Sequence, residues 1–143
     1  MRTVRQLLES KGPEVHSISP DAAVIDAIRL MAEKGIGALV VLEPGGRLAG
    51  MVSERDYARK IVLDGRSSKE TPVRDIMSTD VVTVGPDEVA PACMQLVTER
   101  RVRHLPVVVD GEVVGLVSIG DLVKAVIEEQ QYELEQLQRY ITT

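Results

Sequence analysis

The sequence predicts a mixed α/β (α+β) fold built from two copies of one unit, each a small β-sheet packed against two helices. Written against itself at an offset of about 66 residues, the 143-residue chain matches twice. Both copies follow the order helix, strand, helix, strand, strand, helix. Short apolar runs indicate the strands, and a 3.6-residue apolar period indicates the helices.

Each copy begins with a short amphipathic turn of helix, at residues 4–8 and 73–77. A β-rich run closed by a Pro-Asp helix start follows, at residues 15–21 and 81–87. The next helix has one apolar face, which we expect to dock on a sheet. Its matching positions are Ala23, Ala27, Leu30 and Met31 in the first copy and Val89, Cys93, Leu96 and Val97 in the second.

Two nearly continuous apolar runs, at residues 38–42 and 104–109, predict buried strands because they are too short for helices. A Gly-containing turn and a second strand follow each run, at residues 48–53 and 113–118, and this order is typical of a hairpin. A closing helix then starts near residue 53 and ends near 63. In the second copy it starts near 118 and continues to about residue 141.

The extended last helix carries an apolar stripe past the body of the second copy, with Glu and Gln between. The stripe consists of Leu122, Val126, Leu134, Leu137 and Ile141. Such a helix needs a partner to cover it, unless it is an independently solvated helix. We therefore divide the chain into a first repeat with its N-terminal short helix (residues 1–68), a second repeat (69–127) and a C-terminal helix extension (128–143).

Composition limits the kinds of function. A net charge of −5 and a pI near 5.1 argue against nucleic acid or an anionic membrane as the main partner. No apolar run is long enough for a membrane span, the N-terminus lacks a signal-peptide pattern, and the one cysteine, Cys93, lies on an apolar helix face. We expect a cytoplasmic protein.

The sequence shows no recognisable catalytic machinery. It has no Cys/His metal spacing, no Ser/His/Asp set and no Gly-rich phosphate loop. A general base with partners is also not visible. We therefore expect no enzyme, no metal and no catalytic cofactor.

The pattern Gly-x-x-Ser-x-x-Asp occurs in both copies, at residues 50–56 and 115–121, where a strand ends and a helix begins. Ser at an N-cap with Asp three residues later resembles a capping box, which is a purely structural role. The same geometry suits a nucleotide. The helix N-terminus and the Ser hydroxyl offer donors to a phosphate, and the Asp carboxylate accepts hydrogen bonds from a vicinal diol.

With these elements, the chain resembles a tandem pair of CBS domains, the cystathionine β-synthase type module, over almost its whole length. The resemblance implies two repeats related by a pseudo-twofold axis, with clefts for adenine nucleotides such as AMP, ATP, NAD or S-adenosylmethionine. It assigns the ribose hydroxyls to Asp56 and Asp121, and the phosphate to Ser53 and Ser118. Because CBS pairs commonly dimerise, it also implies a homodimer with the tail helix at or near the interface.

The resemblance places the adenine against apolar walls near Ser17 and Ile18 in the first copy and near Thr83 and Val84 in the second. Ile119 could complete a wall. Pro106, on the strand of residues 104–109, belongs to the same candidate site.

The two copies differ at the start of this strand. Arg103 and His104 stand where the first copy has Gly37 and Ala38, and in the family a basic residue here often contacts phosphate. In the first copy, Arg55 or Arg59 could substitute. The alternative is that Arg100, Arg101 and Arg103 form only a solvated helix end.

The expected function is a regulatory module that binds an adenine nucleotide, with AMP as the expected ligand, and changes conformation to modulate an unknown effector protein. The alternative is a structural dimerisation module without a physiological ligand.

Overall fold

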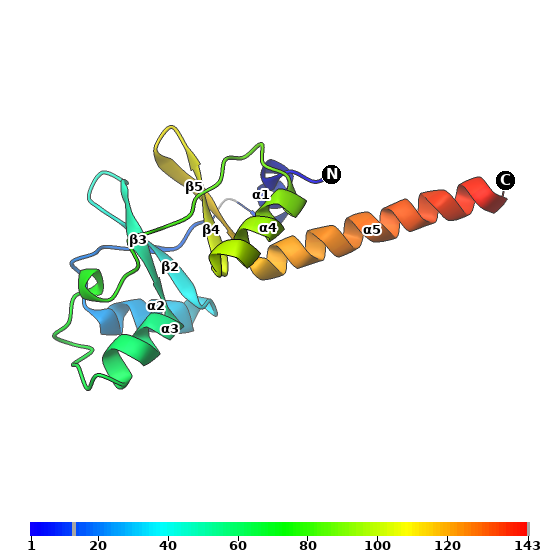
Figure 1. Ribbon diagram of the computed structural model, residues 1–143. Coiled ribbons are helices and arrows are strands. Elements are labelled where there is room, and N and C mark those ends of the chain that lie inside the picture. Colours follow the sequence, from blue (N-terminus) through cyan, green and yellow to red (C-terminus); the bar gives the residue numbers. More distant parts are fainter. Residues whose placement is uncertain (13, 143) are drawn as a thin grey trace. The chain divides into compact units, whose positions relative to one another are not determined.

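The computed structural model describes residues 1–12 and 14–142, which form two compact units (Figure 1). The first-repeat unit contains residues 14–81 and 110–113. The second-repeat unit contains residues 1–12, 82–109 and 114–142. Each unit combines a small sheet with helices, as the sequence predicts.

The sheet of the first-repeat unit has three strands in the order β1 (Ser17–Ile18), β2 (Ala38–Leu42) and β3 (Leu48–Ser53). β1 is parallel to β2, and β2 is antiparallel to β3. The helical elements are α2 (Val24–Lys34), α3 (Glu54–Tyr57), the π-helical η1 (Ala58–Val62) and the 3-10 turn η2 (Val73–Asp75). Their apolar faces form one core: Val24, Ala27, Met31, Leu39, Val41, Val52, Ile61, Val73 and Ile76.

The second-repeat unit contains α1 (Val4–Lys11), α4 (Ala90–Arg100), β4 (His104–Val109), most of β5 (Glu112–Ser118) and α5 (Ile119–Thr142). β4 and β5 form a two-stranded sheet. Val84 forms an isolated parallel bridge with Val107 of β4. This bridge corresponds to the parallel pairing of β1 with β2 in the first-repeat unit. The core is Val4, Leu7, Val84, Ala90, Cys93, Val97, Leu105, Val107, Val117, Leu122 and Ala125.

The short helix that opens each repeat packs in the unit of the other repeat. Val4 of α1 is fully buried in the core of the second-repeat unit, and Val73 of η2 is fully buried in the core of the first-repeat unit. The compact units therefore differ from a division at residue 68, which places α1 with the first repeat and η2 with the second.

Two glycines of the repeated pattern allow these opening segments to approach the hairpins. A Cβ at Gly50 would lie 2.5 Å from the backbone oxygen of Ser78. A Cβ at Gly115 would lie 2.5 Å from a methyl group of Leu8 in α1. The glycine at the start of Gly-x-x-Ser-x-x-Asp is thus a close-packing position in both units.

Three local features differ from the sequence prediction. The closing helix of the first repeat is a single turn, α3, that continues as the π-helical η1 instead of one α-helix to residue 63. The β-rich run at residues 81–84 forms only the Val84 bridge. The run at 15–21 shortens to the two residues of β1.

The long final helix is present as predicted. α5 runs as one continuous helix to the end of the described residues (Figure 1). Leu122 and Ala125 are buried in the second-repeat unit, and every residue from 130 to 142 is exposed. Among the described residues, none of the helices combines the length and apolar character that a membrane span requires.

Candidate functional site

Ser118 and Asp121 form a reciprocal cap at the first turn of α5. The backbone N–H of Ser118 donates to Asp121 Oδ2 at 2.8 Å, and the backbone N–H of Asp121 donates to Ser118 Oγ at 3.1 Å. The capping role of this pair is therefore present. The cap also fixes the carboxylate at the end of β5, where the side chain is partly exposed.

A lysine from α1 reaches this carboxylate. Lys11 Nζ lies 2.8 Å from Asp121 Oδ2 and donates a second hydrogen bond to the backbone oxygen of Leu116 at 2.7 Å. Both side chains remain partly exposed. Burial raises the pKa of Asp121, but the hydrogen bonds from Lys11 and Ser118 outweigh burial, so the pKa lies below its ordinary value.

His104 and Arg103 lie beside this pair, at the start of β4. Burial is the main cause that lowers the pKa of His104, and the positive charges of Lys11 and Arg103 lower it further against the opposing effect of Asp121. The backbone of Arg103 accepts a hydrogen bond from the N–H of Ile119 at 2.9 Å. The Arg103 side chain is exposed. Lys11 and His104 thus lie near this carboxylate, and the backbone of Arg103 is bonded to the first residue of α5.

The apolar residues assigned to this site lie on the same edge of the unit. The backbone N–H of Val84 donates to the oxygen of Pro106 at 3.1 Å, which joins these two positions directly. Val84 and Pro106 are buried, whereas Thr83 and Ile119 are exposed. Buried Val84 and Pro106 serve the core, so only their backbone groups and the exposed neighbours are available to a ligand.

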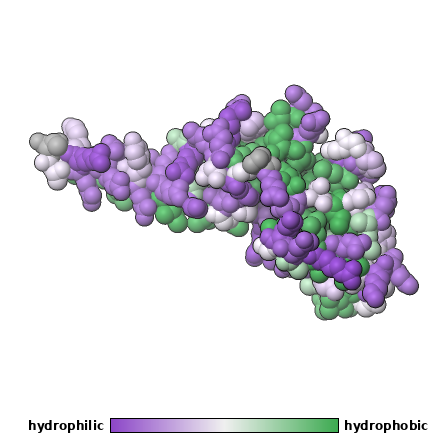
Figure 2. All heavy atoms as spheres, turned by 180° about the vertical axis from the view of Figure 1, so that it is seen from behind, coloured by the Kyte–Doolittle hydropathy of each residue, from purple (hydrophilic) through white to green (hydrophobic). Residues whose placement is uncertain are grey.

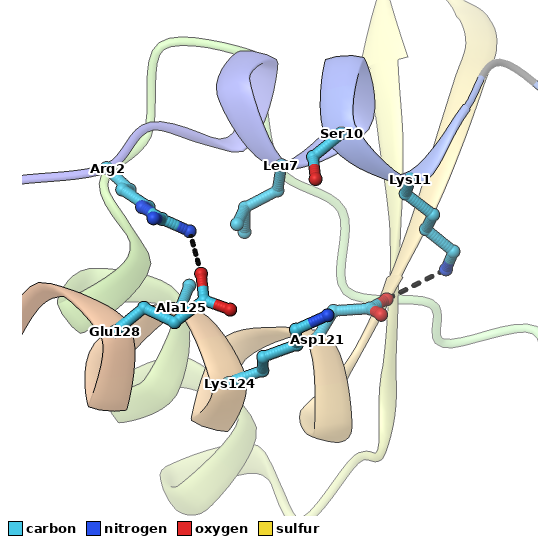
Figure 3. A pocket seen from close by; sticks show the side chains of 8 residues that line it. All are labelled: Arg2, Leu7, Ser10, Lys11, Asp121, Lys124, Ala125 and Glu128. Carbon is cyan, nitrogen blue, oxygen red and sulfur yellow. Dashed lines mark hydrogen bonds and ion pairs between the residues drawn. The ribbon is translucent and has the colours of Figure 1, made fainter.

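A pocket of about 210 Å³ opens beside Asp121, between α1 and α5 (Figure 3). In this view Lys11 pairs with Asp121 at one end and Arg2 pairs with Glu128 at the other. The remaining lining residues are Leu7, Ser10, Lys124 and Ala125. Within the described part of the chain, the side chain of Lys124 forms neither a hydrogen bond nor an ion pair, which leaves one unmatched positive charge at the pocket.

The first-repeat unit repeats the cap with Ser53 and Asp56. The backbone N–H of Ser53 donates to Asp56 Oδ2 at 2.9 Å, and the Asp56 N–H donates to Ser53 Oγ at 3.2 Å. A lysine again covers the carboxylate. Lys60 Nζ lies 3.4 Å from Asp56 Oδ1 and donates to the backbone oxygen of Ile76 at 2.8 Å.

The other residues assigned to the first-repeat unit are spread along its sheet. Ser17 and Ile18 pair with Val40 and Val41 of β2, and Ile18 packs against the core while Ser17 is exposed. Arg55 is exposed on the first turn of α3. Gly37 and Ala38 supply no charge here.

Lys11 and Lys60 are the two residues that sequence reasoning missed. Lys60 lies four residues after Asp56 on a helical segment, so an i, i+4 pairing rule could have found it. Lys11 is 110 residues from Asp121 in sequence and comes from a segment that packs in the unit of the other repeat. No local signal in the sequence indicates that contact.

The family model described as "CBS domain" matches this chain twice, at residues 4–63 and 73–128. The "CBS domain-containing protein CBSX3, mitochondrial" of Arabidopsis thaliana is 44% identical over 147 residues, which cover 97% of this chain and 71% of that protein. Among solved structures, a protein with CBS domains from Burkholderia ambifaria MC40-6 is 52% identical with a TM-score of 0.85, and the match covers 90% of this chain and 96% of that one.

A more distant structure shares the fold alone. The CBS domain pair of protein MJ0100, solved in complex with 5-methylthioadenosine and S-adenosyl-L-methionine, is 19% identical with a TM-score of 0.80. The match covers 90% of this chain and 98% of that one.

Proposed function

This chain belongs to the CBS domain family as a tandem pair, and on that premise we propose that it is a regulatory module that binds an adenine nucleotide. Binding changes its conformation and so modulates the affinity for an effector protein. We propose no catalytic step. The cytoplasmic location expected from the sequence is part of the same proposal, although one relative is named mitochondrial.

The observation that carries this proposal is the placement of Asp121. Its carboxylate stands at the start of α5 as the acceptor that a ribose diol requires, Lys11 donates a hydrogen bond to it, and His104 lies within range of its charge. The apo ion pair with Lys11 is partly exposed, so solvent screens it and a ligand can replace it at low cost.

We propose that the two sites are unequal. Asp56 has the same cap as Asp121, but Gly37 and Ala38 stand where the second repeat has Arg103 and His104. A phosphorylated ligand gains more from the second-repeat unit, because an opposite charge is available there. AMP is the ligand we propose first. ATP, NAD and S-adenosylmethionine share the adenosine group, and an adenosine compound occupies the MJ0100 pair.

The direct test is a thermal-shift and calorimetric titration of the purified full chain with AMP, ATP, NAD and S-adenosylmethionine. A ligand present at about 100 times its Kd stabilises the folded state by about 2.7 kcal/mol, which corresponds to a rise in Tm of roughly 5–10 °C for a chain of this size. No shift with any of the four would favour the alternative, a structural dimerisation module without a ligand.

Three variants locate the site. Asp121→Asn keeps the shape and a capping oxygen but removes the charge, and it should weaken AMP binding at least about 10-fold. Arg103→Ala and His104→Ala should each weaken AMP binding while leaving adenosine binding nearly unchanged. Asp80→Asn, an exposed acid outside both caps, is the control for the lost charge. Unchanged AMP affinity in both basic-residue variants would refute the phosphate assignment.

We also propose that the protein is a homodimer with the tail helix at or near the interface. The support is the run of exposed residues from 130 to 142 that continues a helix whose beginning is buried in the second-repeat unit.

A further inference from the structure

Five exposed aliphatic residues of α5 follow a heptad spacing, whereas Ile119, Tyr132 and Tyr140 are exposed outside it. Val123, Ile127, Leu134, Leu137 and Ile141 are 40%, 48%, 58%, 56% and 76% exposed. With Gln130 they form one series, 123, 127, 130, 134, 137 and 141, in which steps of four and three residues alternate throughout. We call these six residues the seam.

The seam is a different face from the one that α5 buries in its own unit. Leu122 and Ala125 point into the core and are at most 1% exposed, whereas none of the seam residues is buried. Beside the seam, the tail is mostly polar, with Glu128, Glu129, Glu135, Gln136 and Arg139. Figure 2 shows the tail as mostly hydrophilic, with a few hydrophobic patches along it.

An alternation of three and four residues is the pattern of a coiled coil, because a 3.5-residue repeat keeps one stripe facing a second helix. A globular surface would instead be covered by a broader stripe with a 3.6-residue period. In heptad terms, Ile127, Leu134 and Ile141 are the a residues, and Val123, Gln130 and Leu137 are the d residues. Ile127 and Ile141 at a and Leu137 at d match the combination of β-branched a and Leu d that favours two strands, whereas Leu134, Val123 and Gln130 do not.

The polar residues of the helix distinguish the two orientations of an identical partner. In a parallel pair the two Gln130 side chains meet in one layer and can hydrogen-bond to each other, and Glu133 faces Gln138 of the other copy. In the antiparallel register that covers the whole seam, Gln130 lies against Leu134 and the two Glu133 carboxylates lie side by side. The antiparallel pair therefore leaves a polar group unmatched and brings like charges together.

We infer that the seam of α5 is the contact between two copies of this chain, which pair their tails as a parallel two-stranded coiled coil over residues 123–141. This inference rests on the homodimer proposed above and adds its location, orientation and register. It does not depend on the identity of the nucleotide.

The test compares two lysine variants of the full chain by sedimentation velocity and light scattering. Leu137→Lys places a charge in the seam, and Gln136→Lys makes the same change of charge on the adjacent outward face. Leu137→Lys removes one buried Leu side chain from each copy, so it should raise the dimer Kd about 100-fold or more. Gln136→Lys should dimerise like the wild type.

Both variants should keep the wild-type circular dichroism spectrum and AMP titration, since residue 137 is exposed in a single chain. A wild-type chain that is monomeric, or that assembles to three or more copies, overturns the inference. So does a Leu137→Lys variant that remains a wild-type dimer. Because AMP binding is measured separately, loss of nucleotide binding bears on the proposed function alone.

Cross-linking tests the orientation. Gln130→Cys should form a disulfide-linked dimer under mild oxidation in a parallel pair, where the two residues share a layer. Glu135→Cys, on the outward face, is the control and should not. The native Cys93 is buried and gives no background. Absence of a Gln130→Cys cross-link in a chain that still dimerises would contradict the parallel arrangement.

Discussion

Three residues of the second repeat carry a charge or a titratable group where the first repeat has Gly or Ala. Arg101 ends α4 in the left-handed conformation, with φ 54°, at the position where Gly35 ends α2 with φ 65°. The left-handed conformation is unfavourable for a residue with a side chain. Of the next two differences, His104 lies near Asp121, and Arg103 accepts a backbone hydrogen bond from Ile119, two residues before Asp121. The repeat thus tolerates an unfavourable backbone position at the same segment that supplies its positive charge.

His104 should make stability depend on pH. Its pKa is 6.5 in the unfolded chain and lower in the folded one, because burial and Lys11 oppose protonation. Protons therefore bind preferentially to the unfolded state. The contribution of His104 is fully present above about pH 6.5 and is lost as the pH falls through the folded pKa.

Urea unfolding at a series of pH values checks this prediction. The wild type should lose free energy of unfolding below pH 6.5, and His104→Gln should lose less over the same interval. An identical pH dependence in the two proteins would show that His104 does not contribute.

The candidate site could be predicted only where its residues are close in sequence or related by the repeat. Ser118 and Asp121 are three residues apart, and their pattern recurs at Ser53 and Asp56. Lys11 could not be predicted, since its contact depends on where α1 packs. Each carboxylate is covered by its own lysine, Lys11 for Asp121 and Lys60 for Asp56. Because these two lysines come from different elements, aligning the copies does not identify them.

At the scale of elements, the two glycines that open the repeated pattern have different tolerances. Gly50 faces the backbone oxygen of Ser78, which accepts from Met51 N–H at 2.9 Å, and Ser78 N–H donates to the Met51 oxygen at 2.8 Å. Gly115 faces only the side chain of Leu8. A backbone atom cannot move aside without breaking this pairing, whereas a leucine side chain can change its rotamer.

Gly50→Ala should therefore lower the free energy of unfolding by roughly 3 kcal/mol, and Gly115→Ala by about 1 kcal/mol. Chemical denaturation of both variants measures the difference. Adding Leu8→Ala to Gly115→Ala should remove the steric part of the cost, as a double-mutant cycle would reveal. Equal losses for the two glycine variants would contradict the distinction.

The order of helices and strands could be predicted from the apolar period and the turn residues, but two local features could not. The sequence predicts one closing helix to residue 63, and the apolar pattern alone does not distinguish an α-helical turn from the π-helical η1. Similarly, the run at residues 81–84 has β-forming residues, but backbone pairing with β4 forms only at Val84. Pairing depends on the neighbouring strand, which local propensity does not describe.

At the scale of the whole molecule, each unit is completed by the opening segment of the other repeat. The core residue Val4 is encoded at the start of the first repeat, yet it packs with Val97, Leu122 and other residues of the second. A division at the repeat boundary would leave both cores incomplete. Repeat matching predicts equivalent elements correctly, but it does not say which copy of an element joins which core.

Val4→Ala provides the test. Because Val4 is 0% exposed, the truncation should cost roughly 2 kcal/mol. Native-state hydrogen exchange should show reduced protection mainly in residues 90–125 and little change in residues 24–61. A protection loss centred on residues 24–61 would mean that α1 belongs energetically with its own repeat.

The position of α1 also affects the order in which the chain can fold during synthesis. In the sequence α1 precedes Ala125, a member of the core that α1 joins, by more than a hundred residues. Domains that fold as they emerge usually do so from the N-terminus. Here α1, with its apolar Val4 and Leu7, must wait for the residues up to 125 before its core can form, whereas residues 14–81 contain every member of the other core.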